Sequence, residues 1–252
     1  MSETKQCENC FWYGKPIECP AEYDVDKKTC KGFKQKTKIE MKVLQSHEEW
    51  LKNRFRIGGS DASAVIGMNP WKTNVELWEE KTGLCKPADI SDKPYIQYGH
   101  QAEPLLRELF KLDFPEYEVF YEENNLFLNG KYPWGHFSAD GWLLDKDGRK
   151  GVLEIKTTEI LQSMQKEKWN KRLPDNYYIQ LLHGLLIMEA DFAILKAQLK
   201  TVFDGVPYLQ TKHYHIERSE VEGDIQYLAT EEEKFWRYVE SKQQPPLILP
   251  NI

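Results

Sequence analysis

A pair of charged residues inside an apolar strand constrains the fold of this chain more than any other feature. The segment GVLEIKTT, residues 151–158, places Glu154 and Lys156 two positions apart. Side chains alternate between the faces of a strand, so both groups lie on the same face of a sheet. A carboxylate supplies an oxygen ligand for Mg²⁺, and a lysine beside it holds the attacking water or the scissile phosphate. The strand therefore predicts a sheet that carries a metal-dependent phosphodiester hydrolase site.

A second acidic residue, Asp140, lies fourteen positions before Glu154 at the end of another apolar segment, GHFSADGW. Taken separately, Asp140-Gly141 is typical of a turn, and Glu154 of a surface ion pair. Together with Lys156 they favour a metal site with Asp140 and Glu154 as ligands. Lys156 then stabilises charge on the phosphate or orients the water, which requires no lowered pKa, although a lowered pKa would allow it to act as a base.

Helical and strand-like patterns alternate along the chain. Thr73 and Glu76 form a capping box ahead of one expected helix, and Gly83 is suited to end it. We expect helices at residues 74–82, 97–112, 158–169, 175–188 and 219–240. We expect strands at residues 119–127, 136–144, 151–157, 192–201 and 208–217. This order predicts an α/β fold in which helices flank a mixed β-sheet, with one main domain and a small appendage.

The appendage is a cysteine-rich segment, since four of the five cysteines, Cys7, Cys10, Cys19 and Cys30, lie within the first thirty residues. Four thiolates in so short a segment can enclose one tetrahedral Zn²⁺, whose binding would supply the folding energy of a segment without a core. The alternatives are reduced structural cysteines, a redox pair at Cys7 and Cys10, or an iron–sulfur cluster. We predict a zinc-binding segment over residues 1–36.

Charge and hydropathy narrow the classes of partner. Seven lysines between positions 27 and 42 form either a solvated linker or an arm that neutralises phosphates. The net charge of −6 argues mildly against broad coating of nucleic acid, but hardly against an enclosed site in which a cation reverses the local charge. Without a membrane-length apolar run or a secretory hydrophobic region, we expect a soluble, cytoplasmic protein.

The arrangement Asp140…Glu154-x-Lys156 resembles the PD-(D/E)xK nuclease superfamily. The motifs around it are similar, in sequence and in order, to those of the YqaJ-type viral recombinase exonucleases, relatives of phage lambda exonuclease. These motifs are RIGGSDAS from residue 56, GMNPW from residue 67, WEEKTG from residue 78 and YGHQAE from residue 98. The resemblance runs from about residue 54 to residue 202. It implies a restriction-endonuclease-like sheet and an exonuclease domain over residues 37–252.

The resemblance also implies roles for individual residues. Asp140, Glu154 and the Ile155 carbonyl would bind Mg²⁺ or Mn²⁺, and Glu103 would bond to the metal or to its water. Gln180 would complete the catalytic set from the following helix. Arg56 and Ser60 would hold a terminal 5′-phosphate, with Ser60 capping a helix. Four further residues have roles that the sequence leaves open: His136 and Ser138 as supporting groups, His183 as a core histidine, and Trp71 as a core residue or a wedge at the duplex fork.

The function implied is a Mg²⁺-dependent exonuclease that degrades the 5′-terminated strand of linear double-stranded DNA, leaving 3′ overhangs for phage-type recombination. Family members of this kind form trimers and work with a single-strand annealing protein in a bacterial host, so both partners are implied. One alternative is an endonuclease or structure-selective nuclease of the same fold. Another is a DNA-binding module that has lost catalysis, which the intact Asp140, Glu154 and Lys156 set argues against.

Overall fold

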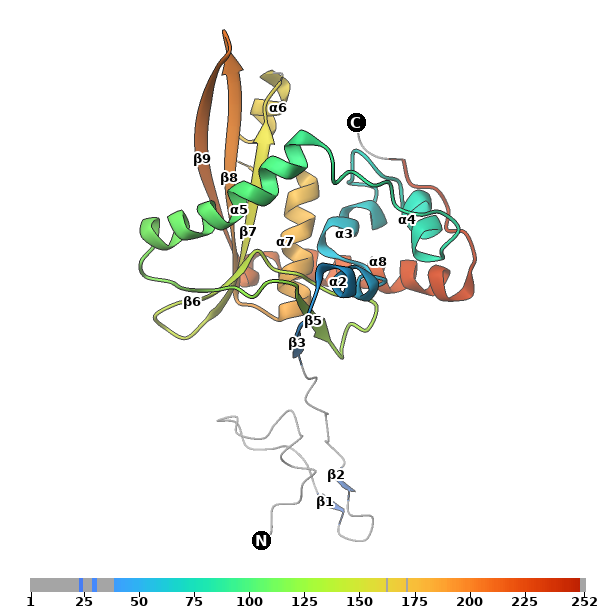
Figure 1. Cartoon of the computed structure of the whole chain (residues 1–252). Helices are drawn as coiled ribbons and strands as arrows, with labels where there is room; N and C mark the ends of the chain where they lie inside the picture. The colour runs from blue at the N-terminus through green and yellow to red at the C-terminus, as the bar shows by residue number, and fades with distance from the viewer. Residues whose placement is uncertain (1–22, 25–28, 31–38, 162, 171, 250–252) are drawn as a thin grey trace.

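The computed structural model describes residues 23–24, 29–30, 39–161, 163–170 and 172–249 (Figure 1). Its helices are α2 His47–Asn53, α3 Gly59–Val65, α4 Asn74–Lys81, α5 Pro94–Asp113, α6 Ser163–Lys168, α7 Asp175–Met188 and α8 Arg218–Ser241. Its strands are β1 Tyr23–Asp24, β2 Thr29–Cys30, β3 Ile39–Val43, β4 Glu118–Phe120, β5 Asn125–Asn129, β6 Gly141–Leu144, β7 Lys150–Glu159, β8 Phe192–Phe203 and β9 Val206–Glu217. The zinc site predicted at Cys7, Cys10, Cys19 and Cys30 falls outside the residues whose side chains are described.

A mixed sheet of five strands forms the centre of the molecule, in the order β4-β6-β7-β8-β9. β7 and β8 run parallel, whereas the other neighbouring strands are antiparallel. A parallel pair requires a crossover, and the chain makes it through α6 and α7. The mixed sheet flanked by helices, predicted from the order of the elements, is confirmed.

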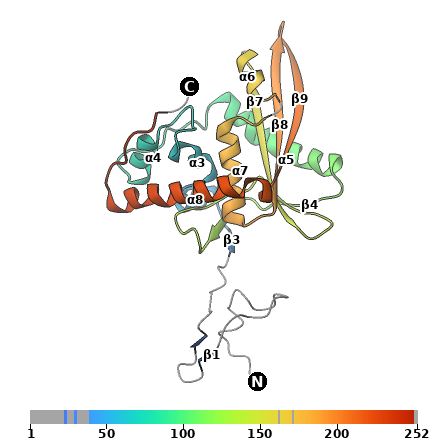
Figure 2. The same ribbon diagram turned by 180° about the vertical axis from the view of Figure 1, so that it is seen from behind.

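Helices cover both faces of this sheet. α5 crosses one face (Figure 1), where Leu106 and Phe110 pack against a cluster that includes Leu153 and Ile155. α7 and α8 lie on the opposite side (Figure 2), and α7 packs its apolar residues against a larger cluster that includes Val152. Successive residues of β7 therefore point to opposite faces. Glu154 and Lys156 share the face of Val152, as the spacing of two predicts.

Several predicted boundaries differ from the structure because of long-range pairing. The expected strand at 119–127 is two strands, since β4 pairs with β6 whereas β5 pairs with β3. Asn124 has a φ of +55° between them, a left-handed conformation that asparagine tolerates better than most residues. The expected helix at 158–169 is shorter, because β7 continues in parallel with β8 as far as Glu159. α7 spans residues 175–188 as predicted.

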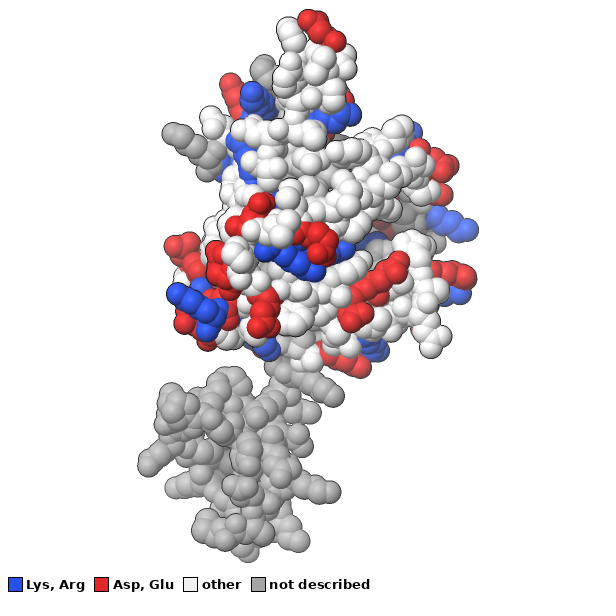
Figure 3. All heavy atoms as spheres, turned by 60° about the vertical axis from the view of Figure 1, so that its left-hand side comes forward, with Lys and Arg blue, Asp and Glu red and all other residues white. Residues whose placement is uncertain are grey.

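None of the described helices is both long enough and apolar enough to cross a bilayer. The face of the molecule shown in Figure 3 carries acidic and basic side chains close together, without a broad basic band. This distribution agrees with the acidic composition of the chain. This face therefore has no broad positive potential of the kind that attracts polyanions.

Candidate active site

The predicted catalytic residues come together in one cleft of about 660 Å³. β7 contributes Glu154 and Lys156, α5 contributes Glu103, and α7 contributes Gln180. Asp140, immediately before β6, completes the set. Five polar residues that are separated by up to 77 positions therefore line one cavity, although the sequence placed them on four different elements.

Glu154 lies at the centre of the hydrogen bonds in this cleft and is 1% exposed. Its Oε1 accepts a bond from Lys156 Nζ at 2.5 Å and another from Gln180 Nε2 at 2.5 Å. Its Oε2 is buried and has no partner. Among the described residues, one other buried side-chain atom, Nδ1 of His136, also lacks a partner, and His136 lines the same cleft. Buried polar atoms without a protein partner are rare in proteins, and a bound ion or water is a common partner for such atoms.

Asp140 is fixed against the neighbouring strand. One carboxylate oxygen, Oδ2, accepts a bond from the backbone N–H of Ile155 at 2.8 Å, and the Asp140 carbonyl accepts a bond from Arg107. The contact with Ile155 brings the main chain at position 155 beside Asp140. The geometry thus joins the three residues that the sequence proposes as metal ligands, Asp140, Glu154 and Ile155.

The carboxylates of the cleft are difficult to ionise in the absence of a cation. Burial and the nearby charge of Asp140 raise the pKa of Glu154 to about 8. The same two causes raise the pKa of Glu103 to about 7, although Arg107 opposes them. Burial acts to lower the pKa of Lys156, but Glu154 and Asp140 outweigh it and raise that pKa above its ordinary value. This direction favours the charged form of Lys156 and is opposite to the lowered pKa that a general base requires.

These residues suit a hard divalent cation. Among the described residues, no group of three His, Cys, Asp or Glu side chains lies close enough to hold an ion by itself. Mg²⁺ is commonly bound by one or two carboxylates and otherwise by water and substrate phosphate. Asp140 and the unpaired Oε2 of Glu154 match that pattern, and Glu103 faces them from α5.

The arginine that lines the cleft near Ser60 is not the one that the sequence predicts for the phosphate pocket. Ser60 lines the cleft, but Arg56 does not: its guanidinium stacks on the ring of Phe55 at 4.8 Å. Arg54 lines the cleft instead, with its guanidinium 4.2 Å from the ring centre of Trp50. Sequence reasoning missed Arg54. The available signal was its position four residues after Trp50, which puts both side chains on one helical face.

The glycines at the start of α3 determine how closely this helix approaches its neighbours beside the cleft. A Cβ atom at Gly59 would lie 3.0 Å from the ring of Phe137 and 3.1 Å from the Gln180 side chain, so glycine allows the close approach. The N-cap of α3 is Gly58 and not Ser60, which is the second residue of the helix. The expectation that Ser60 caps the helix is therefore wrong, because the cap lies two residues earlier, where Asp61 accepts a bond from the Gly58 N–H.

The remaining residues that the sequence singled out have clear positions. His183 is buried, and its ring nitrogens bond to Glu232 at 2.6 Å and to the His136 carbonyl at 2.9 Å. Ser138 accepts a bond from the Trp50 indole at 2.9 Å, which ties α2 to the wall of the cleft. Trp71 is 74% exposed, so it is not a core residue.

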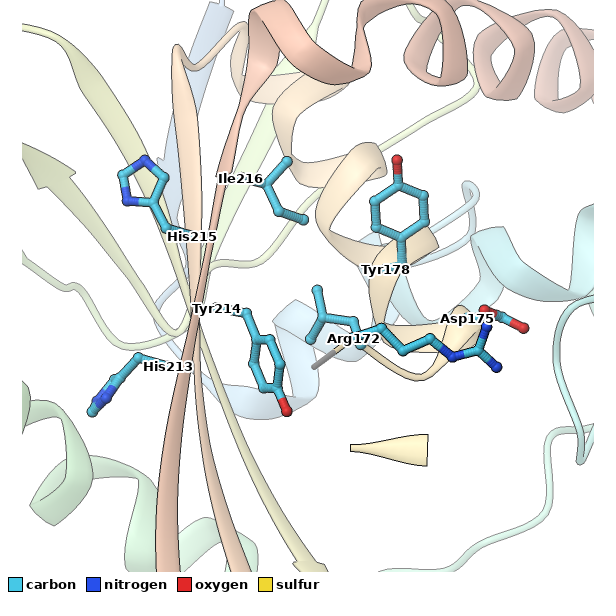
Figure 4. A pocket seen from close by; sticks show the side chains of 8 residues that line it. Arg172, Asp175, Tyr178, His213, Tyr214, His215 and Ile216 are labelled. Carbon is cyan, nitrogen blue, oxygen red and sulfur yellow. The ribbon is translucent and has the colours of Figure 1, made fainter. Parts of the chain in front are cut away.

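Another hollow, of about 520 Å³, lies between β9 and the start of α7 (Figure 4). Tyr214 and Ile216 point into it from β9, whereas His213 and His215 point to the other side of the strand. Tyr178 faces it from α7, and its hydroxyl donates to Asp224 at 2.6 Å. None of the predicted catalytic residues lines this hollow.

We expect replacement of Glu232 by alanine to lower the free energy of unfolding by about 3–5 kcal/mol. Glu232 and His183 are both fully buried, and Glu232 also accepts a bond from the Trp134 indole. Loss of the carboxylate leaves two buried donors without an acceptor. Urea unfolding measures the change, with Glu233→Ala as a control whose surface ion pair with Arg237 contributes about 0.5 kcal/mol or less. Equal stability of the two variants would contradict the burial of this pair.

The site and its sheet define the class of this protein. Asp140, immediately before β6, lies beside the Glu154–Lys156 pair in the middle of β7, and together they form the arrangement of the PD-(D/E)xK superfamily. Within that class, residues 49–191 match the family described as the YqaJ-like viral recombinase domain, and the chain belongs to this family.

Individual relatives agree with this placement. The chain is 30% identical over 167 residues to the uncharacterized protein YqaJ of Bacillus subtilis (strain 168), a match covering 64% of this chain and 50% of that protein. The chain thus spans about half the length of this relative. The crystal structure of an alkaline exonuclease (LHK-Exo) from Laribacter hongkongensis superimposes with a TM-score of 0.58 at 17% identity, covering 78% of this chain and 94% of that one. LHK-Exo in complex with dAMP gives a TM-score of 0.56, also at 17% identity and with the same coverage. At this identity the likeness shows a shared fold.

Proposed function

We propose that this protein is a Mg²⁺- or Mn²⁺-dependent DNA exonuclease that degrades the 5′-terminated strand of linear duplex DNA. The observation that carries the proposal is the buried Oε2 of Glu154, which has no partner and lies in the cleft that Asp140 and Lys156 also line. Membership of a viral recombinase family and the shared fold with an alkaline exonuclease, also crystallised with dAMP, support a DNA-end substrate.

The residues of the cleft divide the work of hydrolysis. A bound Mg²⁺ would activate water and stabilise the leaving oxygen, and Asp140 and Glu154, with the Ile155 carbonyl, would hold it. Lys156 remains charged and stabilises the negative charge that develops on the phosphate. Gln180 donates to the same Glu154 oxygen as Lys156 does, which fixes the carboxylate and leaves the other oxygen free. Glu103 acts from the opposite wall on the metal or on its water.

We assign the terminal phosphate to Arg54 and Ser60, in place of the Arg56 and Ser60 pair suggested by the sequence. Both Arg54 and Ser60 line the cleft, and a guanidinium fork matches the oxygens of a phosphate. The guanidinium of Arg56 stacks on the ring of Phe55, and Arg56 does not line the cleft.

Replacement of Arg54 by alanine is expected to reduce the preference for 5′-phosphate over 5′-hydroxyl ends by about 10- to 100-fold, since one charge-assisted hydrogen bond contributes about 1.5–3 kcal/mol. Arg56→Ala is the matched control and should leave the preference within about two-fold of the wild-type value. The measurement compares initial rates on two duplexes that differ in the 5′ group alone. An Arg56→Ala variant that loses the preference while Arg54→Ala keeps it would restore the assignment made from the sequence.

The decisive experiment for the function uses linear duplex with a 5′-phosphate on one strand, beside a closed circle, with Mg²⁺ or EDTA. Metal-dependent loss of the phosphorylated strand, with the circle intact, supports the exonuclease. Cleavage of the circle would indicate the endonuclease or structure-selective alternative. Binding without any cleavage would indicate a DNA-binding module.

The proposal also covers the N-terminal segment, the oligomeric state, the partner protein and the cellular location. Residues 1–36 form a zinc-binding segment through Cys7, Cys10, Cys19 and Cys30, ahead of the exonuclease domain at residues 37–252. The clustering of these cysteines supports the zinc site. The protein acts as a homotrimer with a single-strand annealing protein, in the cytoplasm of a bacterium that carries a phage or prophage. The family membership supports these partners and this setting.

A further inference from the structure

Arg107 is a buried arginine on α5 that the proposed hydrolysis does not use. It is 5% exposed and lies one helical turn after Glu103, in the wall of the cleft. A buried guanidinium retains its charge, and its desolvation is costly unless partners compensate it. An arginine in this environment therefore needs a specific set of contacts.

The contacts of Arg107 join the two walls of the cleft. The same nitrogen, Nη1, donates to Glu103 Oε1 at 3.1 Å and to the carbonyl oxygen of Asp140, 33 positions away. The plane of Tyr121 covers the guanidinium, with Cζ at 3.4 Å from the ring centre. Arg107 thus links helix α5 to the start of strand β6 beneath an aromatic ring.

The contacts of Arg107 determine which carboxylate oxygens of Glu103 and Asp140 remain available to bind a cation. Asp140 is fixed through its carbonyl by Arg107 and through Oδ2 by the Ile155 N–H, and Glu103 is fixed through Oε1. One oxygen of each carboxylate is left for a cation. Arg107 therefore holds Glu103 and the main chain of Asp140 together through a single nitrogen, Nη1.

We propose that Arg107 is a positioning residue for the metal site, which sets the distance and orientation between Glu103 and Asp140 without contacting the substrate. This inference rests on the proposed function, since it concerns the same divalent cation. The groups that orient metal ligands typically contribute about 10- to 100-fold to metal affinity. Loss of Arg107 therefore weakens metal binding in a protein that is still folded.

The test is titration of the protein with Mn²⁺ in the absence of DNA, by calorimetry, beside thermal unfolding of each variant. We expect Arg107→Gln to weaken Mn²⁺ binding at least about ten-fold. The matched control, Lys111→Ala, lies one turn further along α5, where Lys111 pairs with Glu108 at the surface, and it should bind as the wild type does. In nuclease assays, a raised Mn²⁺ concentration should restore much of the Arg107→Gln rate, because the defect lies in metal affinity.

Unchanged Mn²⁺ affinity in folded Arg107→Gln, with or without a lower melting temperature, would overturn the proposal and make Arg107 a structural residue. If Arg107→Gln does not fold, Mn²⁺ binding is measured on Arg107→Lys instead, since this variant keeps the charge but loses the planar guanidinium. Weaker Mn²⁺ binding by Arg107→Lys supports the role, and wild-type binding overturns it. A wild-type protein that binds Mn²⁺ but cleaves no DNA would refute the proposed function and leave the role of Arg107 intact.

Discussion

Replacement of Lys156 by alanine is expected to lower the rate of DNA cleavage by about a thousand-fold or more, the scale associated with loss of a preorganised charge at the reacting group. Lys156 is the cation bonded to the carboxylate at the centre of the cleft, and Glu154 and Asp140 keep it charged. Single-turnover cleavage of an end-labelled duplex at saturating enzyme measures the chemical step separately from binding.

The Lys156→Ala variant should still fold, because Glu154 can take up a proton when its partner is removed. Lys150→Ala, at the exposed end of the same strand, is the control and should retain wild-type activity. Thermal unfolding and DNA binding should be nearly unchanged in both variants. Cleavage at the wild-type rate by Lys156→Ala would show that the site has been assigned to the wrong residues.

Cleavage at a fixed, subsaturating Mg²⁺ concentration is expected to rise steeply between about pH 6 and pH 8.5, by about ten-fold for each pH unit over which one of these groups titrates. Glu103 and Glu154 have pKa values of about 7 and about 8, so both hold protons at the lower pH. A proton must leave before each carboxylate can bind a cation. Higher Mg²⁺ concentrations should move the rise to lower pH, because the metal competes with protons. A rate that does not change with pH over this range would contradict the burial of these carboxylates.

The same groups predict how stability depends on pH in EDTA. The pKa values of Glu103 and Glu154 in the folded protein, about 7 and about 8, lie above the ordinary value of 4.5. Folding therefore takes up protons at any pH between 4.5 and these values. The contribution to stability is fully present below pH 4.5 and is lost as the pH rises through about 7 to 8. Added Mg²⁺ should therefore raise the melting temperature more at about pH 8.5 than at about pH 6, because the carboxylates have lost their protons at the higher pH and can bind the cation.

The features that the sequence predicted well are those set by neighbours in the chain. A spacing of two puts Glu154 and Lys156 on one face of β7, whatever packs above it. The capping box of Thr73 and Glu76 starts α4, and apolar spacing delimits α7 at residues 175–188. The strand–helix order alone was sufficient to predict a mixed sheet between helices, because a parallel pair needs a crossover.

The tertiary structure decided what depends on distant segments. The sequence favoured Arg56 for the phosphate, whereas the fold places Arg54 in the cleft and stacks Arg56 on Phe55. Arg107 was indistinguishable from a surface arginine until α5 met the start of β6. The raised pKa values of Glu103 and Glu154 likewise arise from burial and from the charge of Asp140. Local patterns determine which face of its own helix or strand a side chain occupies, whereas contacts between elements determine its neighbours. In this cleft, contacts between elements determine the protonation of the carboxylates and which of their oxygens can bind a cation.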